Sequence, residues 1–308
     1  NAILLMANSV PYLVQSLVVA KSIRNCGNKQ HIVLIFIPQQ NKERLEDAER
    51  FISSNQEIID SLNIQILHIN EPPCSLKHIK NTYYKNLITK SIRHTAYLYK
   101  LYPWSLTQYK KVLFLDSDML VRKNLDHLFE KDCDFLYSDG PASPLNAGMF
   151  LAKPCDLTFK ALRNMLLEGD FSYDKGWRGL GRTHEFFNAI ETDQGLLYYF
   201  FIKDKFKGVV HKVERKLYNN QTPFDIFDLV KYKDHKKLEH LIDPKDVVIV
   251  HFSGWGQLYD HNGGKKWDDP SFKKVKINNK IEERIKVPFH QEWLNTRNSL
   301  NLSTLVIQ

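Results

Sequence analysis

The chain has 308 residues, of which 43% are hydrophobic and 25% charged. This balance excludes a disordered chain and provides enough apolar surface for a sizeable core in one large domain or two small ones. The net charge of +8 favours anionic partners, such as nucleic acid, an acidic membrane or a phosphate-bearing small molecule. No apolar run approaches the length of a membrane span, and the four widely spaced cysteines predict buried free thiols rather than a zinc site.

Apolar runs of strand length alternate with helical patterns between residues 2 and 115. The patterns predict strands at 2–7, 31–37, 64–69 and 111–115, and helices at 11–23 with Ser9 as a cap, after a cap at Asn41, and at 87–102. This alternation predicts a parallel sheet covered by helices on both faces.

The elements expected in the second half are shorter. Strands are predicted at 135–137, 149–152 and 247–250, and helices at 124–129, 155–167 and 193–201. From Lys265 onward the sequence becomes polar and basic, which is typical of a surface extension or a partner-docking tail.

The apolar strand that ends at Leu115 leads directly into Asp116-Ser117-Asp118. Ligands of open α/β sheets bind outside the carboxyl ends of strands, and two acids two residues apart point to one side of a strand. Such a carboxylate pair is a hard-oxygen site for Mg²⁺ or Mn²⁺, which commonly bridges a diphosphate. The alternative is a solvated turn that caps the helix at 124–129; the position after a buried strand favours the metal.

His251 directly follows the late apolar strand at 247–250. If this strand ends beside the acid pair, the imidazole becomes a third ligand and favours Mn²⁺ over Mg²⁺; otherwise it is a core histidine. Gly254 would let the backbone approach a phosphate closely, and Lys265 or Lys266 would add a cation.

Two further segments combine polar side chains with glycine. Asn146-Ala147-Gly148 leads into a strand, and Asp193-Gln194 stands at the start of a predicted helix, where an acid is favourable. Ordinary turn chemistry is an equally good account of each segment taken alone.

These segments occur in an order that resembles the glycogenin-like branch of the family 8 glycosyltransferases. The densest match runs from Tyr99-Lys100-Leu101-Tyr102-Pro103-Trp104 through the Asp-Ser-Asp motif to Phe129, and the resemblance covers roughly residues 2–270. It implies a GT-A fold, in which a Rossmann-like, mostly parallel central sheet has flanking helices. It also implies a catalytic domain at 1–264, with a nucleotide-binding half at 1–118 and an acceptor half at 119–264, and an extension at 265–308.

The resemblance implies a role for each matching residue. Asp116, Asp118 and His251 match the ligands of Mn²⁺, with Mg²⁺ as the second choice. Asp193 and Gln194 match the catalytic pair at the reactive face of the sugar. The positions implied to bind the donor are Leu5, Met6, Ala7, Asn8, Tyr12, Lys100, Asp116, Ser117, Asp118, Asn146, Ala147, Gly148, Gly254 and Lys265. Lys265 fits better than Lys266 because it stands two residues before Trp267.

The implied activity is manganese-dependent, retaining transfer of a sugar, glucose or galactose, from a UDP-sugar to a hydroxyl of a protein or glycan. A self-glycosylating primer of the glycogenin type is the alternative, although neither Tyr218 nor Tyr232 has a convincing local match. Asp193 is the candidate nucleophile of a double displacement, whereas a same-face route needs none, and both remain open. The resemblance also implies a cytoplasmic protein that could form a homodimer, with a lumenal location open if an anchor or signal precedes the chain. Nothing matches a nucleic-acid-binding motif.

The chain departs from the family pattern in three places, one of which is a longer loop than usual between Gly254 and Lys265. Glu191 and Thr192 replace the two glycines that usually precede the Asp-Gln pair, which affects the choice of donor sugar. Residues 173–187 look like an insertion, and the glycines around Trp177 predict either a mobile lid that stacks on an acceptor or a plain surface loop.

Overall fold

The computed structural model describes most of the chain. The described residues are 1–37, 42–90, 92–141, 143–181, 187, 189–204, 206–222, 225, 242–252, 273–277, 280–285 and 289–303. None of the helices within these ranges is long and apolar enough to cross a membrane.

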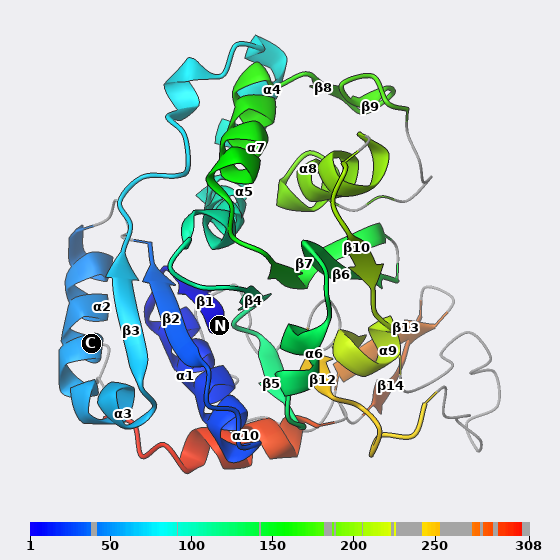
Figure 1. The fold of residues 1–308 in the computed structure, drawn as a ribbon. Coiled ribbons are helices and arrows are strands. Elements are labelled where there is room, and N and C mark those ends of the chain that lie inside the picture. Colours follow the sequence, from blue (N-terminus) through cyan, green and yellow to red (C-terminus); the bar gives the residue numbers. More distant parts are fainter. Residues whose placement is uncertain are drawn as a thin grey trace.

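A seven-stranded sheet forms the centre of the molecule, with the strand order β10-β6-β7-β4-β1-β2-β3 (Figure 1). Its strands are β1 (Ala2–Ala7), β2 (His31–Phe36), β3 (Ile64–His68), β4 (Val112–Leu115), β6 (Phe135–Gly140), β7 (Ser143–Ala152) and β10 (Val210–Lys212). Four of the six neighbouring pairs are parallel, and only β7 runs antiparallel to its neighbours β4 and β6. The prediction of a mostly parallel sheet is confirmed.

Helices cover both faces of this sheet, as the sequence predicts. Side chains alternate along β1, so that Leu5 packs in the core on one face and Leu4 in the core on the other. The first face is covered by α1 (Val10–Asn25), α2 (Lys42–Ser54) and α3 (Gln56–Ser61). The second face is covered by α4 (Thr82–Thr89), α7 (Asp156–Glu168), α8 (Asp193–Tyr198) and a 3₁₀ segment at Leu98–Ser105.

A second, three-stranded sheet lies beside the end of β4. It has the order β11-β12-β5, from β11 (Asn220–Gln221), β12 (Ile249–His251) and β5 (Met119–Val121). The remaining elements are α5 (Ile92–Tyr97), α6 (Asp126–Glu130), α9 (Arg215–Tyr218), α10 (His290–Asn298), a 3₁₀ turn (Leu76–His78), a π-helical turn (Tyr199–Lys203), and the hairpins β8 (Phe171–Ser172) with β9 (Gly176–Trp177) and β13 (Lys273–Ile277) with β14 (Lys280–Ile285).

The single helix predicted at 87–102 is wrong. The chain instead forms α4, α5 and the 3₁₀ segment Leu98–Ser105. The first helix begins earlier because the Asn81 side chain accepts a hydrogen bond from the N–H of Tyr84 and caps it. Pro103 lies within the 3₁₀ segment, where its missing N–H does not permit a regular α-helix to continue. Asn41, the predicted cap of the next helix, lies outside the described residues.

The described residues 289–303 do not form a surface extension. Helix α10, red in Figure 1, packs against α1, and the side chains of Trp293 and Leu294 belong to the same core as Leu17. Arg122 makes an ion pair with Glu292, with 2.8 Å between Nε and Oε2. The described residues 289–303 therefore complete the core of the first half, although they follow a polar, basic stretch.

Trp177 does not act as an exposed stacking surface. Its side chain is fully buried, its indole N–H donates to the carbonyl of Ile190 at 2.8 Å, and the rings of Tyr84 and Phe171 pack on it. Gly176 adopts a φ of +67°, and an added Cβ would lie 2.4 Å from the Tyr199 hydroxyl. This part of the predicted lid is a packed core element; residues 182–186 lie outside the described residues.

The cysteine prediction is confirmed in part. All four thiols are free, but only Cys74 and Cys133 are buried, whereas Cys26 and Cys155 are partly exposed.

The Trp293→Ala variant tests whether the chain end contributes to the core. We expect a loss of about 3–5 kcal/mol in the free energy of unfolding, because the change leaves a large cavity in a core that α1 shares. Urea denaturation measures it, with Asn298→Ala at an exposed position of the same helix as the control. Equal stability of the two variants would show that α10 is dispensable for the fold.

Candidate functional site

Two strands from distant parts of the sequence bring the acid pair and His251 together. Strand β4 ends at Leu115, and the chain turns through Asp116 and Asp118 into β5, which pairs antiparallel with β12. In this register His251 lies opposite Met119. The N–H of Phe252 donates to the carbonyl of Asp118 at 2.9 Å, which fixes the two strand ends side by side.

Asp116, Asp118 and His251 form a cluster suited to a metal ion. One potential ligand atom from each residue lies within 4.8 Å of the others, and Nε2 of His251 is 3.2 Å from Oδ1 of Asp118. His251 is buried. The two acids keep 25% and 30% of their side-chain surface exposed, so their ligand atoms remain accessible. Two carboxylates and one imidazole are a donor set that fits a divalent cation, and the three residues fit the predicted site.

The charges of the cluster are strongly coupled. Burial by itself would lower the pKa of His251, but the adjacent Asp118 carboxylate outweighs it and raises the pKa. The pKa of Asp118 is lowered, because the His251 ring outweighs the burial that would raise it. Burial raises the pKa of Asp116 and outweighs the opposite effect of Lys100. The charged forms of Asp118 and His251 therefore favour each other, and the ring becomes neutral only above its raised pKa.

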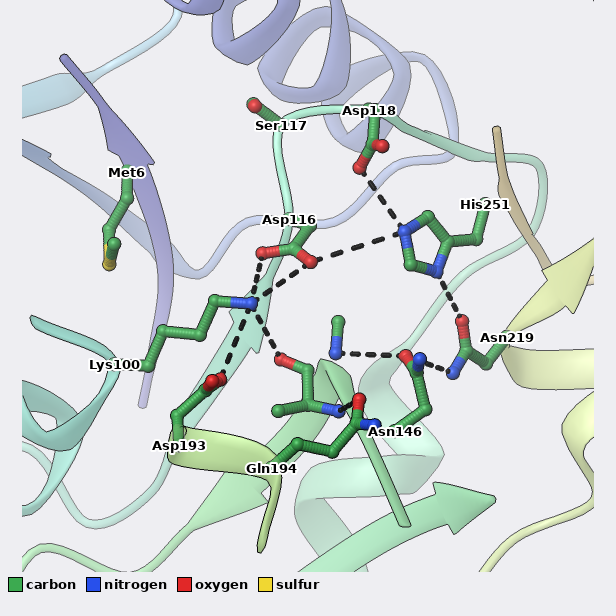
Figure 2. Close-up of polar contacts among 12 residues, drawn as sticks. Met6, Lys100, Asp116, Ser117, Asp118, Asn146, Asp193, Gln194, Asn219 and His251 are labelled. Carbon is green, nitrogen blue, oxygen red and sulfur yellow. Dashed lines mark hydrogen bonds and ion pairs between the residues drawn. The ribbon is translucent and has the colours of Figure 1, made fainter. Parts of the chain in front are cut away.

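Lys100 connects this cluster to the start of α8 (Figure 2). Its ammonium group lies 2.7 Å from Oδ1 of Asp116 and 3.6 Å from Oδ2 of Asp193, and it donates to the carbonyl of Ala147 at 3.2 Å. Burial acts to lower the pKa of Lys100, but the two carboxylates outweigh burial and raise it. Lys100 is thus a permanent buried cation between two acids.

Asp193 is a buried carboxylate in the first turn of α8, and burial raises its pKa. Its Oδ2 atom is buried and has no hydrogen-bond partner among the described residues, since the 3.6 Å to Lys100 exceeds a hydrogen bond. A buried carboxylate oxygen left in this state is suited to accept a hydrogen bond from a ligand hydroxyl. Gly195 permits the first turn of α8 to lie close to the backbone of Ile190, because a Cβ at this position would lie 1.7 Å from the Ile190 carbonyl oxygen.

Gln194 holds the first half of the antiparallel strand β7. Its Oε1 accepts from the N–H of Ala147 at 3.2 Å, and its Nε2 donates to the Ser143 hydroxyl at 3.0 Å. The structure thus brings Asp193, Gln194, Asn146, Ala147 and Gly148 into one site with Lys100 and the acid pair.

Asn219 belongs to this site but was missed by the sequence analysis. It lies between α9 and β11, and its amide contacts both Asn146 and His251 at 2.9 and 2.8 Å. No motif marks it, because the short α9 and β11 have no periodicity that predicts which side chain turns inward.

Two of the donor-binding positions predicted on the N-terminal strand point their side chains into the core. The side chains of Leu5 and Ala7 pack in the core beneath α1, and the Ser117 hydroxyl donates to the Gln15 side chain at 3.4 Å. Met6, Asn8 and Tyr12 are partly buried. For Leu5, Ala7 and Ser117, donor binding by side chains is therefore not supported and would fall to their backbone atoms. Gly254, Lys265, Lys266 and Tyr232 lie outside the described residues.

Comparisons with known proteins find a family match for the part of the chain that carries Lys100, Asp116 and Asp118. Residues 3–138 match the model of glycosyl transferase family 8. Glycogenin-1 of Oryctolagus cuniculus is 40% identical over 97 residues, which are 31% of this chain and 28% of that protein. UDP-glucuronate:xylan alpha-glucuronosyltransferase 1 of Arabidopsis thaliana is 30% identical over 103 residues, 33% of this chain and 15% of that protein. The chain thus matches less than a third of the length of these relatives.

Solved structures show the fold. The galactosyltransferase LgtC, solved with donor and acceptor sugar analogs, has a TM-score of 0.54 at 17% identity, covering 100% of this chain and 98% of that one. The glycosyltransferase GlyE of Streptococcus pneumoniae TIGR4 has a TM-score of 0.54 at 15% identity, covering 98% and 63%. The predicted GT-A fold is confirmed, and the match of residues 3–138 supports the predicted resemblance to the glycogenin-like family 8 glycosyltransferases.

Proposed function

We propose that this protein is a metal-dependent, retaining hexosyltransferase that moves glucose or galactose from a UDP-sugar to a hydroxyl of a protein or glycan acceptor. The observation that carries the proposal is the convergence of Asp116, Asp118 and His251 beside the Lys100–Asp193 pair. The metal ligands would bind the diphosphate of a nucleotide sugar. The buried Asp193 carboxylate, whose Oδ2 has no hydrogen-bond partner among the described residues, would bind its sugar. Homodimerisation and a cytoplasmic location are carried over from the family resemblance as part of this proposal.

The metal end of the site would hold the diphosphate. Asp116, Asp118 and His251 would bind Mn²⁺, which the imidazole favours over Mg²⁺. The bound cation supplies Lewis acidity that stabilises charge on the departing phosphate. Lys100 adds a fixed positive charge on the same side, since its ammonium group is held against Asp116. Gly254 and Lys265 would complete this end, as the family resemblance implies.

The α8 end of the site would hold the sugar. Asp193 would accept a hydrogen bond from a sugar hydroxyl through Oδ2, the oxygen that lacks a partner among the described residues. Gln194 would act by holding the Ala147 backbone and Ser143 in place. Because Asp193 is paired with Lys100, we favour a same-face route, in which it orients the sugar, over a double displacement in which it attacks.

We propose that two halves of the catalytic domain both contribute to this site. The nucleotide-binding half at 1–118 would supply Lys100 and the acid pair, and the acceptor half at 119–264 would supply Asn146, Asp193 and His251. The proposed site lies where the two halves meet.

Self-glycosylation is the second candidate, favoured by the similarity to glycogenin-1. Tyr218 is partly buried, and its hydroxyl lies 2.8 Å from Nε2 of His127. Mass spectrometry of the chain after incubation with UDP-glucose and Mn²⁺ separates the two functions. Hexose adducts on the chain support a primer, and UDP release without adducts supports transfer to a separate acceptor.

The Asp118→Asn variant tests the metal ligands. The amide keeps the size of the side chain but removes the charge that binds a cation, so we expect UDP release from UDP-glucose and UDP-galactose to fall at least about 100-fold. Activity is measured at saturating Mn²⁺, with Asp60→Asn on exposed α3 as the control. Undiminished turnover would remove Asp118 from the site.

The Gly148→Ala variant tests the geometry of the histidine. The added Cβ would lie 2.5 Å from Cε1 of His251, so the ring must shift, and we expect Mn²⁺ affinity to weaken by about 10- to 100-fold. Titration of Mn²⁺ by electron paramagnetic resonance measures the affinity. Gly140→Ala is the matched control, because its added Cβ meets no atom closer than 3.4 Å. Equal affinities would mean that the ring position does not matter.

The Asp193→Ala variant tests the sugar end. UDP has no sugar, so the variant should bind UDP in calorimetry within about threefold of the unchanged protein, while turnover falls by about 100- to 1000-fold. An equal loss of UDP affinity and turnover would instead show that Asp193 holds the site together.

A further inference from the structure

We propose that Asn219 is a positioning residue: it holds His251 in the tautomer that carries its proton on Nδ1, which leaves Nε2 open toward Asp116 and Asp118. The inference rests on the proposed metal site. It follows from a chain of hydrogen bonds that runs from the backbone of Gly148 through Asn146 and Asn219 to His251 (Figure 2).

The chain of hydrogen bonds begins at a backbone N–H, which can only donate. The backbone N–H of Gly148 donates to Oδ1 of Asn146 at 3.0 Å. A backbone N–H cannot accept, so the Asn146 atom that faces it must be the amide oxygen. This contact assigns the orientation of the Asn146 side chain.

The orientation of Asn219 follows from that of Asn146. The Asn146 oxygen lies 2.9 Å from the Asn219 amide, so the facing Asn219 atom must be the nitrogen. The same nitrogen donates to the Ser138 hydroxyl at 2.8 Å. The opposite orientation would place two amide oxygens against each other at hydrogen-bond distance, which is unfavourable in a buried site.

The orientation of Asn219 decides the tautomer of His251. The remaining Asn219 atom, its oxygen, lies 2.8 Å from Nδ1 of His251 and can only accept. Nδ1 must therefore carry the proton, and in the neutral ring the lone pair is on Nε2. This is the nitrogen that lies 3.2 Å from Asp118 Oδ1 and 4.0 Å from Asp116 Oδ2, within the cluster.

Burial makes the assignment firm. Asn219 and Ser138 are fully buried and His251 is 4% exposed, so an unmade hydrogen bond here is costly. The strand pairing explains how Asn219 reaches this place, since Asn220 and Gln221 of β11 pair with Val250 and His251 of β12. Partners that orient a ligating histidine commonly change metal affinity 10- to 100-fold when removed.

The first test needs no metal and no substrate. In protein labelled with ¹⁵N-histidine, at a pH where the ring is neutral, two-bond ¹H–¹⁵N correlation spectra distinguish the two tautomers. We expect His251 to show a protonated Nδ1 and an unprotonated Nε2. A protonated Nε2 would overturn the inference, whatever the protein catalyses.

Variants of the network give the second test. Asn219→Leu keeps the approximate size but removes the acceptor, so we expect a mixture of His251 tautomers and Mn²⁺ affinity lower by about 10- to 100-fold. Asn219→Asp keeps an acceptor for Nδ1 and should retain the tautomer, even where the lost contact to Asn146 lowers stability. An unchanged tautomer and affinity in Asn219→Leu would refute the positioning role.

Ser138→Ala is the matched control, because it removes one hydrogen bond of Asn219 without touching His251. We expect it to keep the tautomer and the Mn²⁺ affinity, and the same losses as in Asn219→Leu would indicate a general structural role instead. If the unchanged protein binds no Mn²⁺, the proposed function fails, while the spectra of His251 still decide the inference about Asn219.

Discussion

The site depends on one buried cation. The ammonium group of Lys100 lies between carboxylates from two elements far apart in the sequence, Asp116 after β4 and Asp193 on α8. Removing one partner from a buried charge pair costs on the order of 3–5 kcal/mol of folding free energy. Lys100, Asp116 and Asp193 therefore stabilise one another. Lys100 thereby holds the proposed metal end and the proposed sugar end of the site at a fixed separation.

The polar network around His251 provides a second constraint, on the other side of the acid pair. The short pairing of β5 with β12 places the ring against Asp118, and the pairing of β11 with β12 places Asn219 behind it. Asn146 connects this network to the backbone of Gly148, whose carbonyl accepts from the N–H of Asp116 at 2.8 Å. The two networks thus share the segment 146–148, and a shift in this segment would change the hydrogen bonds of both.

Sequence patterns predicted strands and helices most accurately where the element is a long apolar run or has a regular apolar periodicity. The four strands of the first half and the helix α7 lie within a few residues of the predicted ranges, because their periodicity reports burial directly. The helix predicted at 87–102 was wrong where a local cap at Asn81 and the constraint of Pro103 outweigh periodicity. Trp177 lies in a segment predicted to be a lid or surface loop and Trp293 in one predicted to be a surface extension or docking tail, yet both side chains are fully buried, since a single large ring can anchor a polar segment.

The sequence by itself determined the sheet, the acid pair at the end of β4 and the resemblance to a glycosyltransferase family, because these depend on contiguous residues and on the order of motifs. It also singled out Lys100, His251, Asp193 and Gln194 as separate candidates. Only the tertiary structure decided which of their atoms meet, that Leu5 and Ala7 turn away, and that Asn219 orients His251. The reason is physical: hydrogen-bond direction and the side to which a residue points are set by contacts between residues far apart in the sequence. Asn219 and His251 are 32 positions apart, and Tyr84, whose hydroxyl donates to the carbonyl of Glu191, is 107 positions from it.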